Sequence, residues 1–175
     1  MKKIIFIFLF VPLYSFSQEV ETFKRNEIKL NVGYLLGAFP EVSYERLIND
    51  ESGAGISAGI NINNNNSDNH FRFGIIPHYR MYFGKKPAAG FFMEGNLAFY
   101  SQHVTSYNYY TYGVTSYYEE RNIFGFGAGI GIGGKFLSKK GVIAELLAGW
   151  GRNFVNTDHL DNNYPRFGIS VGKRF

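Results

Sequence analysis

Hydrophobic and polar residues alternate with a period of two along most of the chain. The pattern is sharpest between residues 124 and 133, where every second residue is glycine and the residues between are apolar. Alternation of this kind predicts β-strands whose two faces meet different surroundings. Eight such segments are predicted, most of them near the ~10 residues of a tilted membrane strand: Glu27–Gly37, Glu41–Leu47, Gly55–Ile62, Phe71–Phe83, Gly90–Tyr100, Ile123–Phe136, Val142–Arg152 and Arg166–Phe175.

The faces and the connectors of these strands favour a membrane barrel over a soluble one. One face of almost every strand is apolar, and the other carries glycine, polar residues and charge. The connectors 49–53, 84–89 and 137–140 are short, whereas 63–70, 101–121 and 154–165 are longer. Short periplasmic turns that alternate with longer external loops are typical of outer-membrane barrels. We therefore expect an all-β fold, an eight-stranded antiparallel transmembrane up-and-down β-barrel, with a bulge or a missing ladder bond at Pro77.

The N-terminus predicts export. Met1-Lys2-Lys3 is a charged region, Ile4–Tyr14 is apolar, and Ser15-Phe16-Ser17 offers a cleavage site. We expect residues 1–17 to be a signal peptide and residues 18–175 to form the outer-membrane barrel domain. A helical membrane anchor is the alternative, but the apolar run is shorter than the ~20 residues required, and Pro12 interrupts it.

Composition narrows the function further. The chain has 21 Gly, 18 Phe and 13 Tyr, which suits many short strands. It has no cysteine, which excludes disulfides, thiolate metal sites and a thiol nucleophile. The net charge of +4 includes Lys2 and Lys3 of the expected leader, so the remaining charge is too small to argue for nucleic acid.

Three segments carry a resemblance to a known family: Pro40–Arg46, Pro77–Phe83 and Gly90–Gly95. They resemble a group of small Bacteroidetes-type outer-membrane barrel proteins of unknown function, with the architecture of OmpA/OmpX-like barrels. The resemblance implies an outer-membrane location and contact with membrane lipid and lipopolysaccharide. The last strand, which ends at Phe175, resembles the signal read by the barrel-assembly machinery.

The charged faces, if they point inward, predict a filled lumen rather than an open pore, since an eight-stranded barrel is only wide enough for side chains. A symmetric turn after the fourth strand places Arg80 opposite Glu94. Lys135 and Glu145 are expected to be diagonal neighbours across the next short turn, because buried charges are stable only when they are paired. Large residues of the fourth and fifth strands, Arg72 among them, are expected to reach across to a wall of glycine formed by strands six to eight.

We predict no catalytic residue, no metal site and no cofactor. The histidines, His70, His78, His103 and His159, do not show a ligand-like spacing. His103 with Thr105 and Ser106 faintly resembles the His/Ser pairs of barrel enzymes that deacylate lipid A, but a recognisable orienting acid is missing. The glycine-rich segment 125–134 keeps the period of two of a strand. A phosphate-binding loop would be followed by a helix, so this segment is not predicted to bind phosphate.

The segment 101–121 is the most distinctive predicted external feature. It contains six tyrosines: Tyr107, Tyr109, Tyr110, Tyr112, Tyr117 and Tyr118. Tyrosine is favoured at recognition surfaces, so this segment is a possible external contact. Equally, the strands could continue past the interface as an aromatic girdle. The leading hypothesis is a non-enzymatic barrel with an envelope role or surface binding; the alternatives are a narrow solute channel and a lipid A-modifying enzyme.

Overall fold

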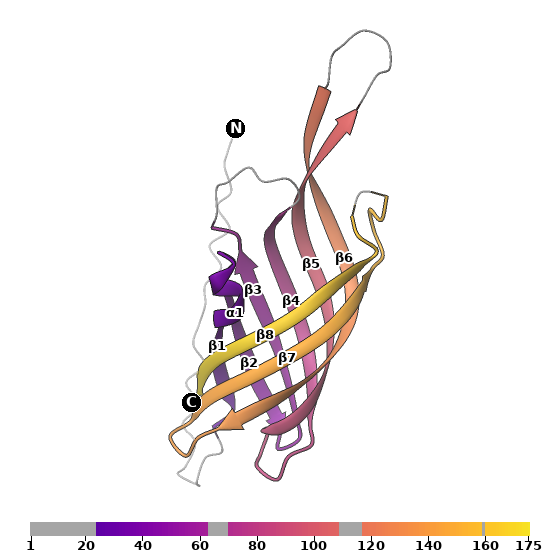
Figure 1. Ribbon diagram of the computed structural model, residues 1–175. Coiled ribbons are helices and arrows are strands. Elements are labelled where there is room, and N and C mark those ends of the chain that lie inside the picture. The colour runs from indigo at the N-terminus through magenta and orange to yellow at the C-terminus, as the bar shows by residue number, and fades with distance from the viewer. Residues whose placement is uncertain (1–23, 63–69, 109–116, 159) are drawn as a thin grey trace, which may run out of the picture.

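A computed structural model describes residues 24–62, 70–108, 117–158 and 160–175. These residues form a closed β-barrel in which each strand pairs with its neighbours in sequence and β8 pairs with β1, all antiparallel (Figure 1). The predicted all-β, eight-stranded up-and-down barrel is confirmed. Its elements are β1 (Asn26–Asn31), α1 (Val32–Leu36), β2 (Glu41–Asn49), β3 (Ser52–Ile60), β4 (His70–Tyr82), β5 (Gly90–Asn108), β6 (Tyr117–Leu137), β7 (Val142–Asn153) and β8 (Asn163–Arg174).

The barrel has two unlike ends. The connections β2–β3, β4–β5 and β6–β7 are short and lie at the end that also holds Phe175; we call this the turn end (Figure 1). The C-terminal ends of β1, β3, β5 and β7 lie at the other end, the loop end. Within the described residues, no helix is long and apolar enough to span a membrane.

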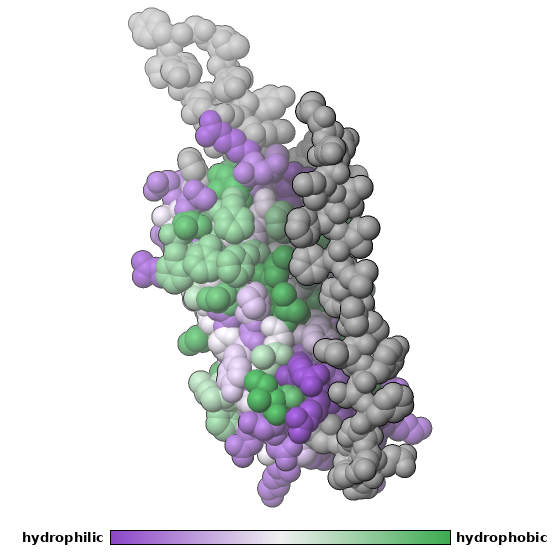
Figure 2. Space-filling view, turned by 180° about the vertical axis from the view of Figure 1, so that it is seen from behind, coloured by the Kyte–Doolittle hydropathy of each residue, from purple (hydrophilic) through white to green (hydrophobic). Residues whose placement is uncertain are grey.

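Alternate residues of each strand point to opposite sides of the wall, and the inward set is the polar one. In β7, the even-numbered residues from Val142 to Trp150 are exposed, whereas Glu145 and Leu147 are buried. Figure 2 shows hydrophobic side chains gathered over the middle and upper part of one face, with hydrophilic residues toward both ends. The strand faces were therefore predicted correctly for most of the barrel.

The first predicted strand is too long. β1 ends at Asn31, and the chain then forms one turn of helix where Glu27–Gly37 was expected to be extended. Asn31 causes the change by capping the helix, since its side-chain oxygen accepts a hydrogen bond from the Tyr34 amide at 3.3 Å. The alternation of residue types in this segment therefore continues past the end of the strand.

Two side chains of β4 point in the directions opposite to those predicted, because the strand contains a bulge. The β4–β5 register shifts between Phe71 and Phe73, so Arg72 is an extra residue and is exposed. Beyond the bulge Phe71 pairs with Gln102, and its ring lies 5.0 Å from the ring of Tyr100. Arg72 was predicted to fill the lumen, and Phe71 takes the inward position instead. Pro77 leaves the register unchanged and marks a gap in the β4–β5 ladder, where pairing resumes at His78.

The segment 101–121 is mostly strand. β5 continues to Asn108 and β6 begins at Tyr117, so the two form a hairpin that rises far above the rest of the barrel (Figure 1). The pairing of Tyr107 with Tyr118 belongs to the same ladder as the pairs inside the barrel. β8 also begins earlier than expected, at Asn163 rather than Arg166. The expected signal peptide, residues 1–17, lies outside the described residues.

Candidate functional site

The lumen contains a buried cluster of charges, which we call the ionic core. Among the described residues, five acidic and five basic side chains are buried inside the barrel, so their formal charges cancel. The set consists of Glu27, Glu41, Glu45, Glu94, Glu145, Lys29, Arg80, Lys135, Arg166 and Arg174. All of them come from inward positions of the strands, because the period-two geometry sends every second residue into the lumen.

Arg80 is central to the ionic core. The β4–β5 register places it opposite Glu94, and its Nη2 lies 2.7 Å from Glu94 Oε2. Its Nη1 also reaches across the barrel to Glu45 Oε2 at 3.0 Å and to Glu145 Oε1 at 2.9 Å. Arg80 therefore joins β2, β4, β5 and β7, which is more than the single cross-strand pair expected from the sequence.

Lys135 and Glu145 differ from the prediction in detail. They are direct partners in the β6–β7 register rather than diagonal neighbours, and Lys135 Nζ lies 4.0 Å from Glu145 Oε2. Lys135 Nζ lies closer to Glu27 Oε2, at 2.7 Å, and it also contacts the Tyr82 hydroxyl. The symmetric-turn argument treats only adjacent strands, and it has no means to find Glu27, which lies on the far side of the barrel.

Glu45 was missed as a site residue although its strand face was assigned correctly. Its Oε2 accepts hydrogen bonds from Lys29 at 2.6 Å and Arg80 at 3.0 Å, and Lys135 lies 3.3 Å away. Its other oxygen accepts a hydrogen bond from Tyr82. One carboxylate thus contacts three cations, and the only sequence signal for it is an inward glutamate at mid-strand.

Two arginines of β8 extend the ionic core toward the two ends. Arg166 Nε donates to Glu94 Oε1 at 2.7 Å, and its Nη1 lies 3.5 Å from Glu41. Arg174 Nη2 lies 2.7 Å from Glu27 and also donates to the Ala88 carbonyl at 2.8 Å. Arg174 therefore ties the β4–β5 turn to the interior of the barrel.

Apolar groups close the lumen above and below the ionic core. At the turn end, Ala88 is fully buried in a cluster with Leu47, Tyr82, Phe92 and Leu147. Toward the loop end, the second cluster consists of Ala98, Tyr100, Val104, Leu160 and Tyr164. Side chains therefore fill the middle and the turn end of the lumen, as the sequence predicted.

The glycine wall of β6 and β7 receives aromatic rings. A Cβ atom on Gly133 would collide with the Phe92 ring, one on Gly125 with the ring of Tyr100, and one on Gly151 with the ring of Tyr164. The expected asymmetry of the lumen is present. However, Phe92 and Tyr100 lie on β5, which is paired with β6, so these rings cover a neighbouring strand instead of crossing the lumen.

The other predicted contact residues are dispersed. Tyr109, Tyr110 and Tyr112 lie outside the described residues; Tyr107, Tyr117 and Tyr118 have backbone positions on the β5–β6 hairpin. His78 is buried in the lumen, with Nδ1 3.2 Å from the Ile76 carbonyl oxygen.

His103 lies on β5 toward the loop end, and its Nδ1 is 3.2 Å from the Asn122 side-chain oxygen. In the described part of the chain, His, Asp and Glu residues do not form a group of three that could hold a metal ion.

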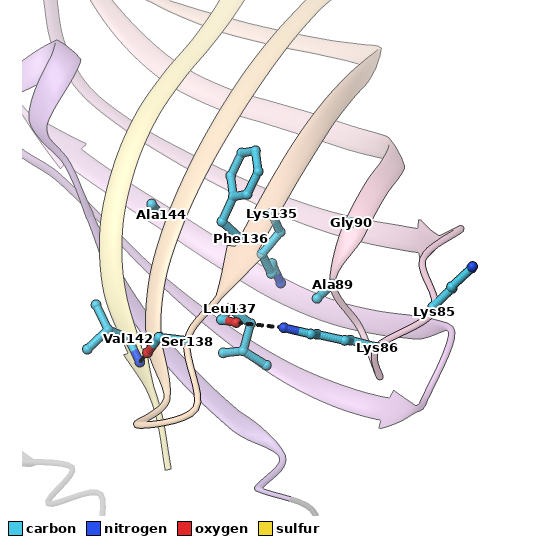
Figure 3. A pocket seen from close by; sticks show the side chains of 10 residues that line it. All are labelled: Lys85, Lys86, Ala89, Gly90, Lys135, Phe136, Leu137, Ser138, Val142 and Ala144. Atoms are coloured by element: carbon cyan, nitrogen blue, oxygen red, sulfur yellow. Dashed lines mark hydrogen bonds between the residues drawn. The ribbon is translucent and has the colours of Figure 1, made fainter.

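A hollow of about 520 Å³ lies on the turn end, between the β4–β5 and β6–β7 turns (Figure 3). Lys86 reaches across it, with Nζ 3.5 Å from the Leu137 carbonyl oxygen, and Lys85 points away. The ten residues that line it include three lysines but no carboxylate or imidazole. Its groups could attract an anion, but they do not provide an acid–base pair.

Comparison with known proteins supports the fold and nothing finer. The structure is similar to the crystal structure of the N-terminal β-barrel domain of Pseudomonas aeruginosa OprF, with a TM-score of 0.50 and 16% sequence identity over 87% of this chain and 98% of that chain. No family model matches the chain, and neither does any curated protein. The barrel architecture thus has independent support, whereas the resemblance to a Bacteroidetes-type family is based on the sequence motifs alone.

Proposed function

We propose that this protein is a non-enzymatic outer-membrane barrel that contributes to the envelope and contacts external molecules through its loop end. The apolar outer wall of the barrel supports this proposal. Large hydrophobic side chains are exposed on every strand, where a soluble protein rarely exposes a continuous apolar patch of more than a few hundred Å². They include Ile28, Val42, Ile56, Phe73, Met81, Leu97, Phe124, Ile132, Leu146, Trp150, Phe167 and Ile169.

The distribution of charge supports this arrangement in a membrane. The buried charged side chains of the barrel wall are paired with one another inside it, and the exposed ones, such as Arg46, Arg72, Arg152 and Lys173, lie toward the strand ends. The middle of the surface toward lipid therefore carries few charges that would need water. At the turn end, Lys85, Lys86, Lys139 and Lys140 are exposed. We assign this end to the periplasm, because short turns are periplasmic in such barrels. The loop end, with the β5–β6 hairpin, is then external.

The closed lumen argues against the channel hypothesis and favours a role at the surface. The ionic core occupies the middle of the lumen, so we assign specific contacts to the loop end rather than to a channel. Tyr107, Tyr117 and Tyr118 lie on the strands of its most prominent hairpin. We expect the apolar wall to contact outer-membrane lipid and the external face to contact lipopolysaccharide.

Trp150 provides a direct test of the membrane location. It is the chain's one tryptophan, and on the outer face of β7 its side chain is 59% exposed. In vesicles of phospholipid brominated along the acyl chains, we expect strong quenching of its fluorescence compared with unbrominated vesicles. The same protein should show heat-modifiable mobility in detergent gels, as a folded barrel does. Unquenched Trp150 in protein that shows the mobility of a folded barrel would contradict the membrane location.

The surface-binding part of the proposal needs a separate experiment. A variant in which residues 107–118 are replaced by a two-residue Asn-Gly turn retains the lower ladder of β5 and β6. We expect it to insert and to quench like the wild type, but to lose binding to lipopolysaccharide vesicles or to whole cells. Equal binding by both proteins would refute the role of the hairpin.

A further inference from the structure

The barrel wall changes character where β1 ends. The β1–β8 ladder runs from the pair Glu27–Arg174 to the pair Asn31–Ser170 and stops there. β8 continues toward the loop end to Asn163, while the chain after Asn31 forms α1. Seven residues of β8, from Asn163 to Ile169, therefore lie beyond the ladder with β1. We call this part of the wall the seam.

Side chains, rather than a strand, satisfy the edge of β8 along the seam. The Tyr34 hydroxyl accepts from the Phe167 amide at 3.1 Å, and the Asn31 oxygen accepts from the Ile169 amide at 3.3 Å. Asn31 also donates to the Phe167 carbonyl at 3.2 Å. These three contacts satisfy backbone groups of the β8 edge at the place where α1, instead of a strand, packs against it.

A cavity of about 430 Å³ lies behind the seam, toward the loop end. Its lining includes Tyr164, which points into the lumen, and also Pro165 and Phe167, which are exposed on the outside. Neighbouring residues of one strand point to opposite sides of the wall. A single cavity lined by residues of both sets therefore reaches the edge of β8.

The lining of this cavity is mostly apolar and aromatic. Phe39 and Tyr34 form one side, with ring centroids 6.0 Å apart, and the Phe39 ring occupies the space that a Cβ on Gly59 would need. Tyr100 and Phe71 form the other side. Its carboxylate, Glu41, is already engaged by Asn31 at 3.3 Å and Arg166 at 3.5 Å. The cavity therefore offers mainly apolar contacts, because its carboxylate is already bound by Asn31 and Arg166.

The surroundings of the seam identify the class of ligand. Leu35 and Leu36 of α1 are 41% and 92% exposed beside it, and Phe167 and Ile169 continue into the apolar outer wall. The volume lies within the ~300–1,000 Å³ of small-molecule sites. It is nearly three times that of an engineered cavity of about 150 Å³ that takes up benzene. A flexible alkyl chain fits such an opening, because it can leave the apolar outer surface and enter without exposing polar groups.

We propose that this cavity binds a single alkyl chain, of a fatty acid or of a membrane lipid, which enters from the side through the seam. The inference extends the proposed membrane location, which would place the entrance against acyl chains. The bound chain lies between Tyr34 and Phe39 on one side and Tyr100 and Tyr164 on the other. The ionic core stops it from passing farther into the lumen.

Photolabelling tests the proposal on the intact protein. One arm uses palmitic acid with a diazirine at the chain end, in detergent micelles. The other uses a phospholipid that carries the same modified chain, in vesicles. Mass spectrometry should find label on the lumen-facing residues Ile76, Tyr100 or Tyr164 in at least one arm. The arm that labels them identifies a free fatty acid or a lipid chain as the source.

Two glycines in adjacent strands provide a matched pair of variants. Gly74 lines the cavity, and a Cβ there would meet its nearest atom, the Tyr100 Cβ, at 3.6 Å, so Gly74→Leu fills the cavity without a clash. Gly95 is on the outer face of β5, and a Cβ there would meet no described atom within 4 Å. We expect Gly74→Leu to abolish labelling of the lumen residues and Gly95→Leu to retain it.

A second variant that fills the cavity keeps the test valid if Gly74→Leu does not fold. Gly37 lines the cavity from the end of α1, and a Cβ there would meet only the Tyr34 carbonyl, at 3.4 Å. Gly37→Leu should therefore also remove the label, with heat-modifiable mobility as the check on folding.

Label confined to outward residues such as Phe73 and Leu97, or lumen label that persists in both blocking variants, would overturn the proposal. Lumen labelling in micelles without quenching of Trp150 in vesicles would preserve the cavity and refute the membrane location; quenching without lumen labelling would refute the cavity alone.

Discussion

Removal of the charge of Glu45 tests how the ionic core supports the barrel. Glu45 is fully buried, and its Oε2 lies 2.6 Å from Lys29, 3.0 Å from Arg80 and 3.3 Å from Lys135. In Glu45→Gln the shape is almost unchanged, but the core becomes a set of five cations and four anions. The amide nitrogen then also faces cationic donors. The variant therefore isolates the charge from the volume of the side chain.

The expected loss follows from these contacts. At an effective dielectric constant of about 20, two unit charges ~4 Å apart attract by about 4 kcal/mol. Three such attractions are largely offset by desolvation and by repulsion from Glu27 and Glu145. Loss of one member of a buried ion pair costs about 3–5 kcal/mol overall. We therefore expect Glu45→Gln to lower the free energy of unfolding by that amount, a shift of about 1 M in the guanidinium midpoint.

Equilibrium unfolding from lipid vesicles, followed by the fluorescence of Trp150, measures this loss. Glu51→Gln is the matched control, because Glu51 is an exposed glutamate in the β2–β3 turn and should change stability by less than about 0.5 kcal/mol. Lys29→Met combined with Glu45→Gln restores equal numbers of cations and anions, so it should recover part of the loss. A loss below 1 kcal/mol for Glu45→Gln, or a double variant whose loss equals the sum of the single losses, would show that the charge of Glu45 does not stabilise the ionic core.

Two further predictions concern the glycine wall and the seam. Gly151→Ala should destabilise the barrel by about 1–3 kcal/mol because its methyl group would overlap the ring of Tyr164. Gly134→Ala, where a Cβ would meet no described atom within 4 Å, should be neutral or stabilising by up to about 1 kcal/mol in the same unfolding assay; equal losses in both would be inconsistent with the wall. Asn31→Ala should speed hydrogen exchange of the Ile169 amide several-fold, since it removes the acceptor of that amide, while the β2–β3 ladder exchanges as before. Unchanged exchange at Ile169 would show that Asn31 does not protect the seam.

The fold could be predicted from the sequence because a barrel of this kind repeats one local rule. Outward residues such as Leu146 and inward residues such as Glu145 alternate without exception through β7, and a one-residue error would reverse every side chain. Even the pairing of Arg80 with Glu94 could be found, because a symmetric turn fixes the register of adjacent strands.

The departures occur where one residue interrupts the period. The bulge at Arg72 reverses the faces beyond it, and the capping side chain of Asn31 turns a strand into a helix. Neither event changes the hydrophobic pattern enough to be seen in the sequence. The contacts of Glu45 with Lys135 and of Lys135 with Glu27 join strands far apart in the chain. Only barrel closure brings them together, so reasoning about adjacent strands could not find them.

Conductance across a planar bilayer shows whether the side chains of this barrel close its lumen. Purified, heat-modifiable wild-type protein should insert and produce no steady ion-sized current, because the charge-neutral ionic core occupies the middle of the lumen and an apolar cluster lies at its turn end. A porin incorporated into the same bilayers serves as the positive control. Stable, reproducible single-channel currents from the wild-type protein would show that the lumen is open.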